Sequence, residues 1–154
     1  MYKIIFILAL AIVPRAEAVT YIYEGGSLTH NNGVMSNLSH FNNNALAITS
    51  NSGGDVGVKI PNTCGQKLAT IVVNVRYLVS AGCAKVGIDN YRHNLLTASP
   101  RHCDAGWVER STIAAVSMST QNIYGVVRIE GNSVVEIDYM EINVGCIDLP
   151  RNWD

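Results

Sequence analysis

The sequence lacks helical periodicity: no segment repeats its apolar residues every 3.6 positions between capping residues. Charge is also scarce, with Asp, Glu, Lys and Arg making up 15% of the chain and no basic cluster. Beyond the first twenty residues, no apolar run is long and uninterrupted enough to cross a bilayer. These absences argue against a helical protein, a membrane partner and a nucleic-acid partner.

Catalytic and metal-binding motifs are missing as well. There is no GxSxG nucleophile elbow, and no two of the four histidines lie at metal-ligand spacing. Glu136, Asp138 and Glu141 are close in sequence, but Glu136 and Asp138 share one face of a predicted strand. That position favours a surface or metal-binding role over glycoside hydrolysis. We therefore expect a protein that is not an enzyme.

The first 18 residues have the pattern of a secretory signal peptide. Lys3 precedes an apolar run from Ile4 to Val13, and Ala16-Glu17-Ala18 is a small-x-small cleavage site. Cleavage leaves residues 19–154, which are 154 − 18 = 136 residues and enough for a single domain with its own core. The sequence thus predicts a secreted, extracellular protein.

All four cysteines fall in the mature part, where an oxidising compartment favours two disulfides. Their spacings of 19, 20 and 43 residues contain no CxxC knuckle, so disulfides are favoured over zinc. Three pairings are possible. The one we favour joins Cys83 to Cys103 around a hairpin, and Cys64 at the start of a central strand to Cys146 at the end of the last strand.

Short β-strands account for most of the mature chain. From Leu68 to Val79, apolar residues alternate with Asn74 and Arg76, which is the period of a strand with one buried face. The same period recurs around Val127 and from Val135 to Tyr139, and Gly131-Asn132 between these runs predicts a tight hairpin. About nine strands separated by Gly, Asn and Ser predict an all-β fold, a jelly-roll β-sandwich of two antiparallel sheets.

A polar segment from Ser27 to Asn44 shows little periodicity and reads as a long surface connection. It contains Asn37-Leu38-Ser39, a sequon for N-glycosylation. In a eukaryotic secreted protein, Asn37 would be exposed on such a loop and available for glycosylation.

Several signals in chain order resemble the galactose-binding-like jelly rolls, and in particular the carbohydrate-binding modules of families six and thirty-five. The matching residues are Glu24, Ser52-Gly53-Gly54-Asp55 before Val56, Ile71 to Tyr77 with Arg76-Tyr77, Gly106-Trp107, and Val135 to Met140. The resemblance covers most of the mature chain. It implies a secreted, non-catalytic, lectin-like module that binds a glycan.

The resemblance also implies a sugar site at the loop end of the sandwich. Trp107 matches a loop tryptophan that stacks on a sugar ring, and Asn143 is the candidate amide. Family members often have a second aromatic near Ile48, where this chain has none, so Tyr91 or Phe41 would have to supply it.

Members of these families also often hold a structural calcium ion. Glu24 and Asp138 are the carboxylates that match its ligands, and Ile22 stands where a further acidic residue is common. Calcium takes six to eight oxygen ligands, so two carboxylates would need many backbone carbonyls beside them. A structural calcium ion is therefore an open possibility on the sequence alone.

A second function stays open on the same residues. The chain could be a structural or interaction protein of an extracellular material, such as a matrix, coat, silk or secretion, that has the jelly roll but no sugar site. The missing second aromatic, the low charge and the Asn-rich segment 31–44 favour it. A small secreted effector that binds another protein is the third alternative.

Overall fold

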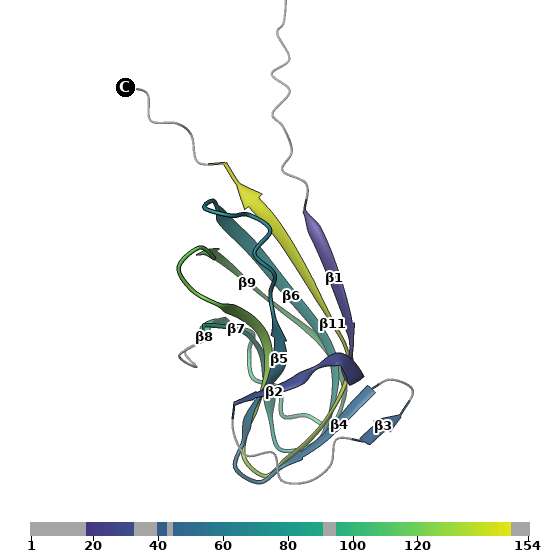
Figure 1. The fold of residues 1–154 in the computed structure, drawn as a ribbon. Coiled ribbons are helices and arrows are strands. Elements are labelled where there is room, and N and C mark those ends of the chain that lie inside the picture. Colours follow the sequence, from purple (N-terminus) through teal and green to yellow (C-terminus); the bar gives the residue numbers. More distant parts are fainter. Residues whose placement is uncertain (1–17, 33–39, 43–44, 91–94, 149–154) are drawn as a thin grey trace, which may run out of the picture.

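The computed structural model describes residues 18–32, 40–42, 45–90 and 95–148. Eleven strands in this part form two antiparallel sheets packed face to face (Figure 1), which confirms the predicted all-β sandwich. The strands are β1 (Val19–Glu24), β2 (Thr29–Asn32), β3 (His40–Asn42), β4 (Ala45–Ser50), β5 (Gly54–Lys59), β6 (Leu68–Ala81), β7 (Ala84–Asn90), β8 (Leu95–Ala98), β9 (Gly106–Ser117), β10 (Ile123–Ile129) and β11 (Ser133–Ile147). A single 3₁₀ turn, η1 (Gly25–Ser27), follows β1, and within these ranges no helix has the length and apolarity to cross a bilayer.

The strand order is that of a jelly roll. The six-stranded sheet has the order β3-β4-β11-β6-β9, with β1 also paired to β11, and the five-stranded sheet has the order β2-β5-β10-β7-β8. Numbered one to eight, strands β4 to β11 therefore follow the orders 1-8-3-6 and 2-7-4-5. Among β4 to β11, all consecutive strands except β7 and β8 lie in opposite sheets, so the turns between them cross the sandwich.

The core lies between the two sheets, and β6 shows its pattern most clearly. From residue 69 to residue 79, every second residue of β6 is at most 1% exposed: Ala69, Ile71, Val73, Val75, Tyr77 and Val79. On β11 the buried positions are Val135 and Ile137, then Met140, Ile142 and Val144, because the register shifts between Ile137 and Tyr139. This bulge places Tyr139 opposite Arg76 on the outer face, whereas simple alternation predicted the buried face for it.

The predicted hairpin at Gly131-Asn132 is wrong. β10 belongs to the five-stranded sheet and β11 to the six-stranded sheet, so this turn carries the chain across the sandwich. Only Asn132 of the pair has a positive φ, 57°, whereas a type I′ hairpin needs a positive φ at both positions. Alternation shows that each strand has a buried face, but it does not show which sheet the strand joins.

Three of these sheet-crossing turns meet at one end of the sandwich. Gly53, in the turn from β4 to β5, and Gly131 approach closely, since a Cβ on Gly53 would lie 3.2 Å from the Gly131 nitrogen. The third turn contains Gly82 (φ +75°), where a Cβ would lie only 2.1 Å from Ser133 Oγ. The buried Ser133 hydroxyl accepts a hydrogen bond from the Cys83 N–H (3.0 Å) and donates one to its carbonyl (3.2 Å). These contacts join the turn after β6 to the first residue of β11.

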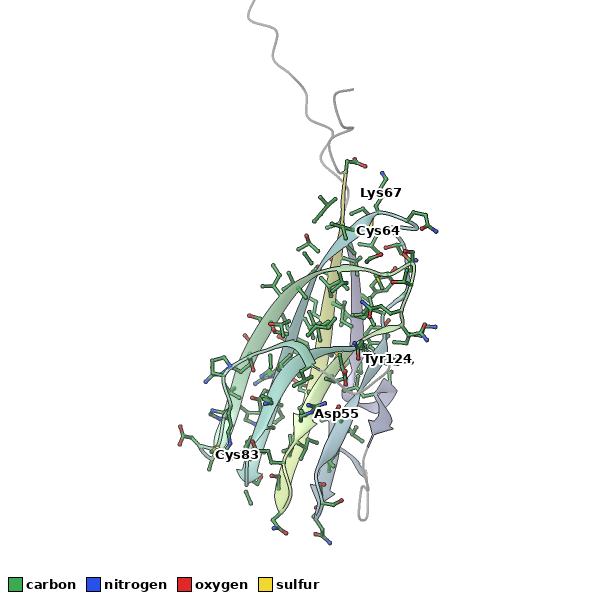
Figure 2. The ribbon with its side chains drawn as sticks, turned by 90° about the vertical axis from the view of Figure 1, so that its left-hand side faces the viewer. Asp55, Cys64, Lys67, Cys83 and Tyr124 are labelled. Carbon is green, nitrogen blue, oxygen red and sulfur yellow. A yellow bond between two sulfur atoms is a disulfide. The ribbon has the colours of Figure 1, made fainter. Side chains whose placement is uncertain are left out.

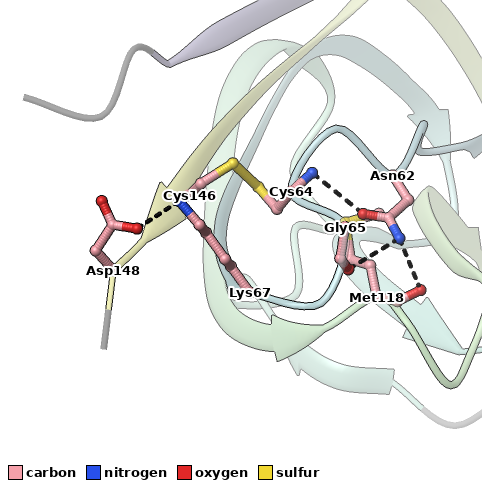
Figure 3. Close-up of a disulfide and its surroundings, with 7 residues drawn as sticks. All are labelled: Asn62, Cys64, Gly65, Lys67, Met118, Cys146 and Asp148. Atoms are coloured by element: carbon pink, nitrogen blue, oxygen red, sulfur yellow. Dashed lines mark hydrogen bonds and ion pairs between the residues drawn. A yellow bond between two sulfur atoms is a disulfide. The ribbon is translucent and has the colours of Figure 1, made fainter. Parts of the chain in front are cut away.

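Two disulfides fasten opposite ends of the sandwich, with the pairing that the sequence analysis favoured. Cys83 bonds to Cys103 at the end where the three turns meet, and Figure 2 shows Cys64 towards the other end. Cys64 bonds to Cys146 and so ties the connection between β5 and β6 to the end of β11 (Figure 3). The Asn62 side chain supports this bridge because its Oδ1 accepts a hydrogen bond from the Cys64 N–H at 3.2 Å.

The segment between η1 and β4 differs from its prediction as a connection without strands. It contains β2, which pairs with β5, and β3, which pairs with β4, so both extend the edges of the sheets. The predicted sequon at Asn37 lies outside the described residues. So does almost all of the predicted signal peptide, and both stay predictions.

Candidate functional site

Trp107 lies on the outer face of the six-stranded sheet. It is the second residue of β9, pairs with Leu78 of β6, and is 45% exposed. The guanidinium carbon of Arg76 lies 5.0 Å from the centre of the indole ring, which is a cation–π contact. The indole is therefore an oriented, accessible platform on a strand, although the sequence placed it in a loop.

Side chains on this outer face form four rows across the strands. Three rows run from β1 through β11 and β6 to β9: Thr20, Asn143, Val72 and Ile113; Ile22, Glu141, Asn74 and Ser111; Glu24, Tyr139, Arg76 and Glu109. The fourth runs from β11 to β9: Glu136, Leu78 and Trp107. The two central rows are mostly polar.

A hollow of about 320 Å³ lies over the central rows. It is lined by Asn74, Val75, Glu109, Arg110, Ser111, Tyr139 and Glu141, which belong to β6, β9 and β11. This volume is at the lower end of the range for small-molecule sites. Its lining combines two carboxylates, an arginine, an amide, a hydroxyl and an aromatic ring, and we refer to it as the face pocket.

Hydrogen bonds hold the polar side chains of the face pocket in place. Tyr139 reaches over β6, and its Oη donates to Glu109 Oε1 at 2.8 Å. Glu141 Oε1 accepts from Asn143 Nδ2 at 2.8 Å and from Asn74 Nδ2 at 3.3 Å. Neutral donors therefore orient both carboxylates, and each keeps a second oxygen, Oε2, for which the described residues provide no hydrogen bond.

Arg76 is the one cation in the rows, and its charge is directed away from these two carboxylates. Its Nη1 lies 2.9 Å from Asp138 Oδ2, and its guanidinium covers the ring of Trp107. Among the ion pairs of the described residues, none involves Glu109 or Glu141. Arg110 also lines the pocket, but its Nη1 donates to the backbone carbonyl of Glu109 at 3.2 Å, so neither carboxylate has an ion-pair partner among the described residues.

The link between Tyr139 and Glu109 has a measurable consequence. The hydrogen bond to Glu109 raises the pKa of Tyr139 above its ordinary value of 10.0, with burial and the nearby carboxylates adding to it. In Glu109→Ala we expect the pKa of Tyr139 to fall, because the phenolate no longer faces that carboxylate. NMR titration of ¹³C-labelled tyrosine, assigned with Tyr139→Phe, measures the change. An unchanged pKa would contradict the contact, and Glu130→Ala is the control.

The structure does not bring Trp107 and Asn143 together. Their partners on β6 are Leu78 and Val72, six residues apart, which is about 20 Å along a strand. Both lie on the outer face, with the face pocket between them, and Asn143 positions Glu141. Tyr91 lies outside the described residues, as does the side chain of Phe41.

The predicted calcium ligands are Glu24 and Asp138. Glu24 pairs with Tyr139, so it lies beside the bulge that holds Asp138, but the Asp138 carboxylate is already bonded to Arg76. Across the described ranges, no group of three or more His, Cys, Asp or Glu side chains is placed to hold a metal ion. Two carboxylates, one of them paired with an arginine, do not fit the six to eight oxygens of a calcium site.

Sequence reasoning missed the residues that line the face pocket, above all Glu109, Tyr139 and Glu141. A signal was present, because Glu109 and Ser111 are polar at every second position, as are Asn74 and Arg76. To combine these signals one must know that β6 lies between β9 and β11, and that a bulge turns Tyr139 outwards.

Comparison with known proteins gives a result at the level of the fold. No family profile matches the sequence, and no curated protein matches it. Among solved structures, a family 35 carbohydrate-binding module from Clostridium thermocellum is similar, with a TM-score of 0.51 and 13% identity over 80% of this chain and 97% of that one.

Two further structures are similar to the same extent. One is the CBM36-1 domain of a multidomain xylanase from the hindgut metagenome of Trinervitermes trinervoides, with a TM-score of 0.54 and 15% identity over 85% of this chain and 100% of that one. The other is a family 36 carbohydrate-binding module in complex with calcium and xylotriose, with a TM-score of 0.52 and 14% identity over 79% and 98%. The chain therefore has the β-sandwich fold of carbohydrate-binding modules, and at this identity the similarity concerns the fold alone.

Proposed function

We propose that the protein is a secreted, non-catalytic carbohydrate-binding module and that its glycan lies in the face pocket, against Trp107. The observation that carries the proposal is the pocket itself, an open hollow lined by oriented polar groups on the same sheet face as an exposed indole. The two disulfides and the fold are consistent with an extracellular protein.

The chemistry of the face pocket suits a sugar. A pyranose ring has apolar C–H faces that stack on aromatic rings and hydroxyls that donate and accept hydrogen bonds. Trp107 offers an aromatic surface one row beyond Arg76 and Glu109, and the Oε2 atoms of Glu109 and Glu141 are available as acceptors. Ser111 adds a hydroxyl to the lining of the pocket, and Asn74 adds an amide.

The position of the face pocket on an open sheet surface favours an extended glycan over a single terminal sugar. From Trp107 at one end to Ile113 at the other, the outer face of β9 spans six residues, or about 20 Å. The polar rows end at β1 and at β9, and in the described part of the sheet no further strand pairs beyond either of them. A chain of several sugar units can therefore cover the face pocket and reach the indole.

Binding to a glycan array tests the proposal. In Trp107→Ala we expect a loss of about 2 kcal/mol, or roughly 30-fold in affinity, because truncating an aromatic anchor removes most of its contact area. Tyr124→Ala is the matched control, since Tyr124 lies on the outer side of the five-stranded sheet. No binding to any glycan would overturn the function, and equal binding by Trp107→Ala would overturn the site.

A second candidate function rests on a different observation. Ile22 and Ile113 are 66% and 59% exposed on the same outer face, and apolar side chains so exposed are common in protein interfaces. This favours the structural or interaction protein of an extracellular material. Failure to bind glycans, together with loss of a protein partner in Ile113→Ser, would support this alternative over the first.

A further inference from the structure

The outer face of the six-stranded sheet is far more acidic than the chain as a whole. Its described residues include five carboxylates, those of Glu24, Glu109, Glu136, Asp138 and Glu141, and one cation, Arg76, giving 1 − 5 = −4. The complete sequence has a formal net charge of only −1. The acidic charge is thus concentrated on the face that holds the pocket.

Within the face pocket this charge has a fixed direction. Glu109 is held by the hydroxyl of Tyr139, and Glu141 by the amides of Asn74 and Asn143, so neutral groups orient both carboxylates without cancelling their charge. Of the nearby cations, Arg76 is bonded to Asp138 and lies over Trp107, and Arg110, which lines the pocket, donates to the Glu109 carbonyl. A ligand in the face pocket therefore meets two anchored negative charges, one on each side of β6.

We infer that the face pocket selects glycans by charge, favouring those that carry protonated amines, such as chains of 2-amino sugars, over neutral or acidic glycans. This inference rests on the proposed function. An ammonium group offers three N–H donors and forms charge-assisted hydrogen bonds with carboxylates, which are stronger than those of a neutral hydroxyl. The pocket supplies two such acceptors, Glu109 Oε2 and Glu141 Oε2. The exposed indole of Trp107 lies two residues from Glu109 on the same face, where it is placed to stack on a sugar ring.

The same arrangement opposes anionic glycans. A uronic acid or sulfate in the face pocket would lie near the carboxylates of Glu109 and Glu141, which outnumber the arginine of the lining, Arg110, and like charges brought together lower affinity. Neutral sugars avoid this repulsion but gain only neutral hydrogen bonds. The expected order of affinity is amino sugar first, neutral sugar second and acidic sugar last.

Titration calorimetry with oligosaccharides of equal length tests the inference. The probes are a glucosamine oligomer, its N-acetylated counterpart and a glucuronic acid oligomer. We expect the glucosamine oligomer to bind at least about tenfold more tightly than the N-acetylated one, and this preference to shrink at high salt because ions screen exposed charges. Equal affinity for the first two, or tighter binding of the acidic oligomer, would overturn charge selection while leaving glycan binding intact.

Charge-removing variants assign the effect to the pocket. Glu109→Gln and Glu141→Gln keep the shape of each side chain, and each is expected to weaken binding of the glucosamine oligomer severalfold more than binding of the N-acetylated oligomer, so that the preference for glucosamine shrinks. Glu130→Gln is the matched control, because Glu130 lies in the turn before β11 and pairs with Arg101. A preference that survives both pocket variants would contradict the inference, and no binding of any oligomer would remove the proposed function as well.

Discussion

Replacing Arg128 with methionine is expected to lower the free energy of unfolding by about 3–5 kcal/mol. Arg128 lies on β10 opposite Asp55 of β5, with its Nε and Nη2 atoms 2.7 Å and 2.6 Å from the two Asp55 oxygens. Its Nη2 is also 3.5 Å from Asp89 Oδ2 on β7. Asp55 and Asp89 are only 1% and 0% exposed, so removing the guanidinium leaves two buried carboxylates without their shared cation.

The size of this effect follows from burial, and a surface pair gives the comparison. The hydrogen bond to Asp55 raises the pKa of Arg128, so the cation stays charged throughout the accessible pH range. Arg101 pairs with Glu130 at 2.8 Å, but these side chains are 59% and 37% exposed, so Arg101→Met is expected to cost less than about 1 kcal/mol. Urea unfolding of both variants measures the difference, and equal losses would contradict this account of the five-stranded sheet.

The second large effect is expected from the bridge between Cys64 and Cys146. It joins residues 82 positions apart, so the double variant Cys64→Ala/Cys146→Ala is expected to lose about 4.5 kcal/mol through the greater freedom of the unfolded chain. The bridge between Cys83 and Cys103 spans 20 positions, and the same relation gives about 3.3 kcal/mol.

Denaturant unfolding of both alanine pairs tests the order of these effects. The Cys64–Cys146 bridge also ties the β5–β6 connection to the end of β11, so its loss is expected to loosen that end of the sandwich first (Figure 3). Hydrogen exchange near Ala69 and Cys146 reads out this local change. A larger loss for the Cys83–Cys103 pair would show that native contacts, and not chain entropy, set the contribution of each bridge.

Much of the fold was predictable because strands with one buried face in a sandwich have apolar residues at every second position of the sequence. β6 is the clearest case, since its buried residues alternate without interruption from Ala69 to Val79. The partner of each strand was not predictable in this way. Ile129 and Val135 have the same local pattern as residues in a hairpin, yet they lie in opposite sheets of a jelly roll.

The candidate site was only partly predictable for the same reason. Trp107 stood out as a single well-placed indole, and it is exposed on the face that holds the pocket. Glu109, Tyr139 and Glu141 come from strands that meet only through the pairing of β9, β6 and β11. The bulge after Ile137 decides which way Tyr139 points, and its trace in the sequence is a change of phase, from Val135 and Ile137 to Met140, Ile142 and Val144. Because Tyr139 and Met140 are adjacent apolar residues at this change, alternation alone does not say which of them is buried.

Mapping of backbone amide shifts by NMR, during titration with the tightest-binding oligosaccharide of the panel, tests most directly whether the outer face of the six-stranded sheet holds the glycan. The account predicts shifts concentrated at residues 74–76, 107–111 and 139–143, together with the indole N–H of Trp107. Shifts confined to the five-stranded sheet or to the turns at the ends of the sandwich would contradict it.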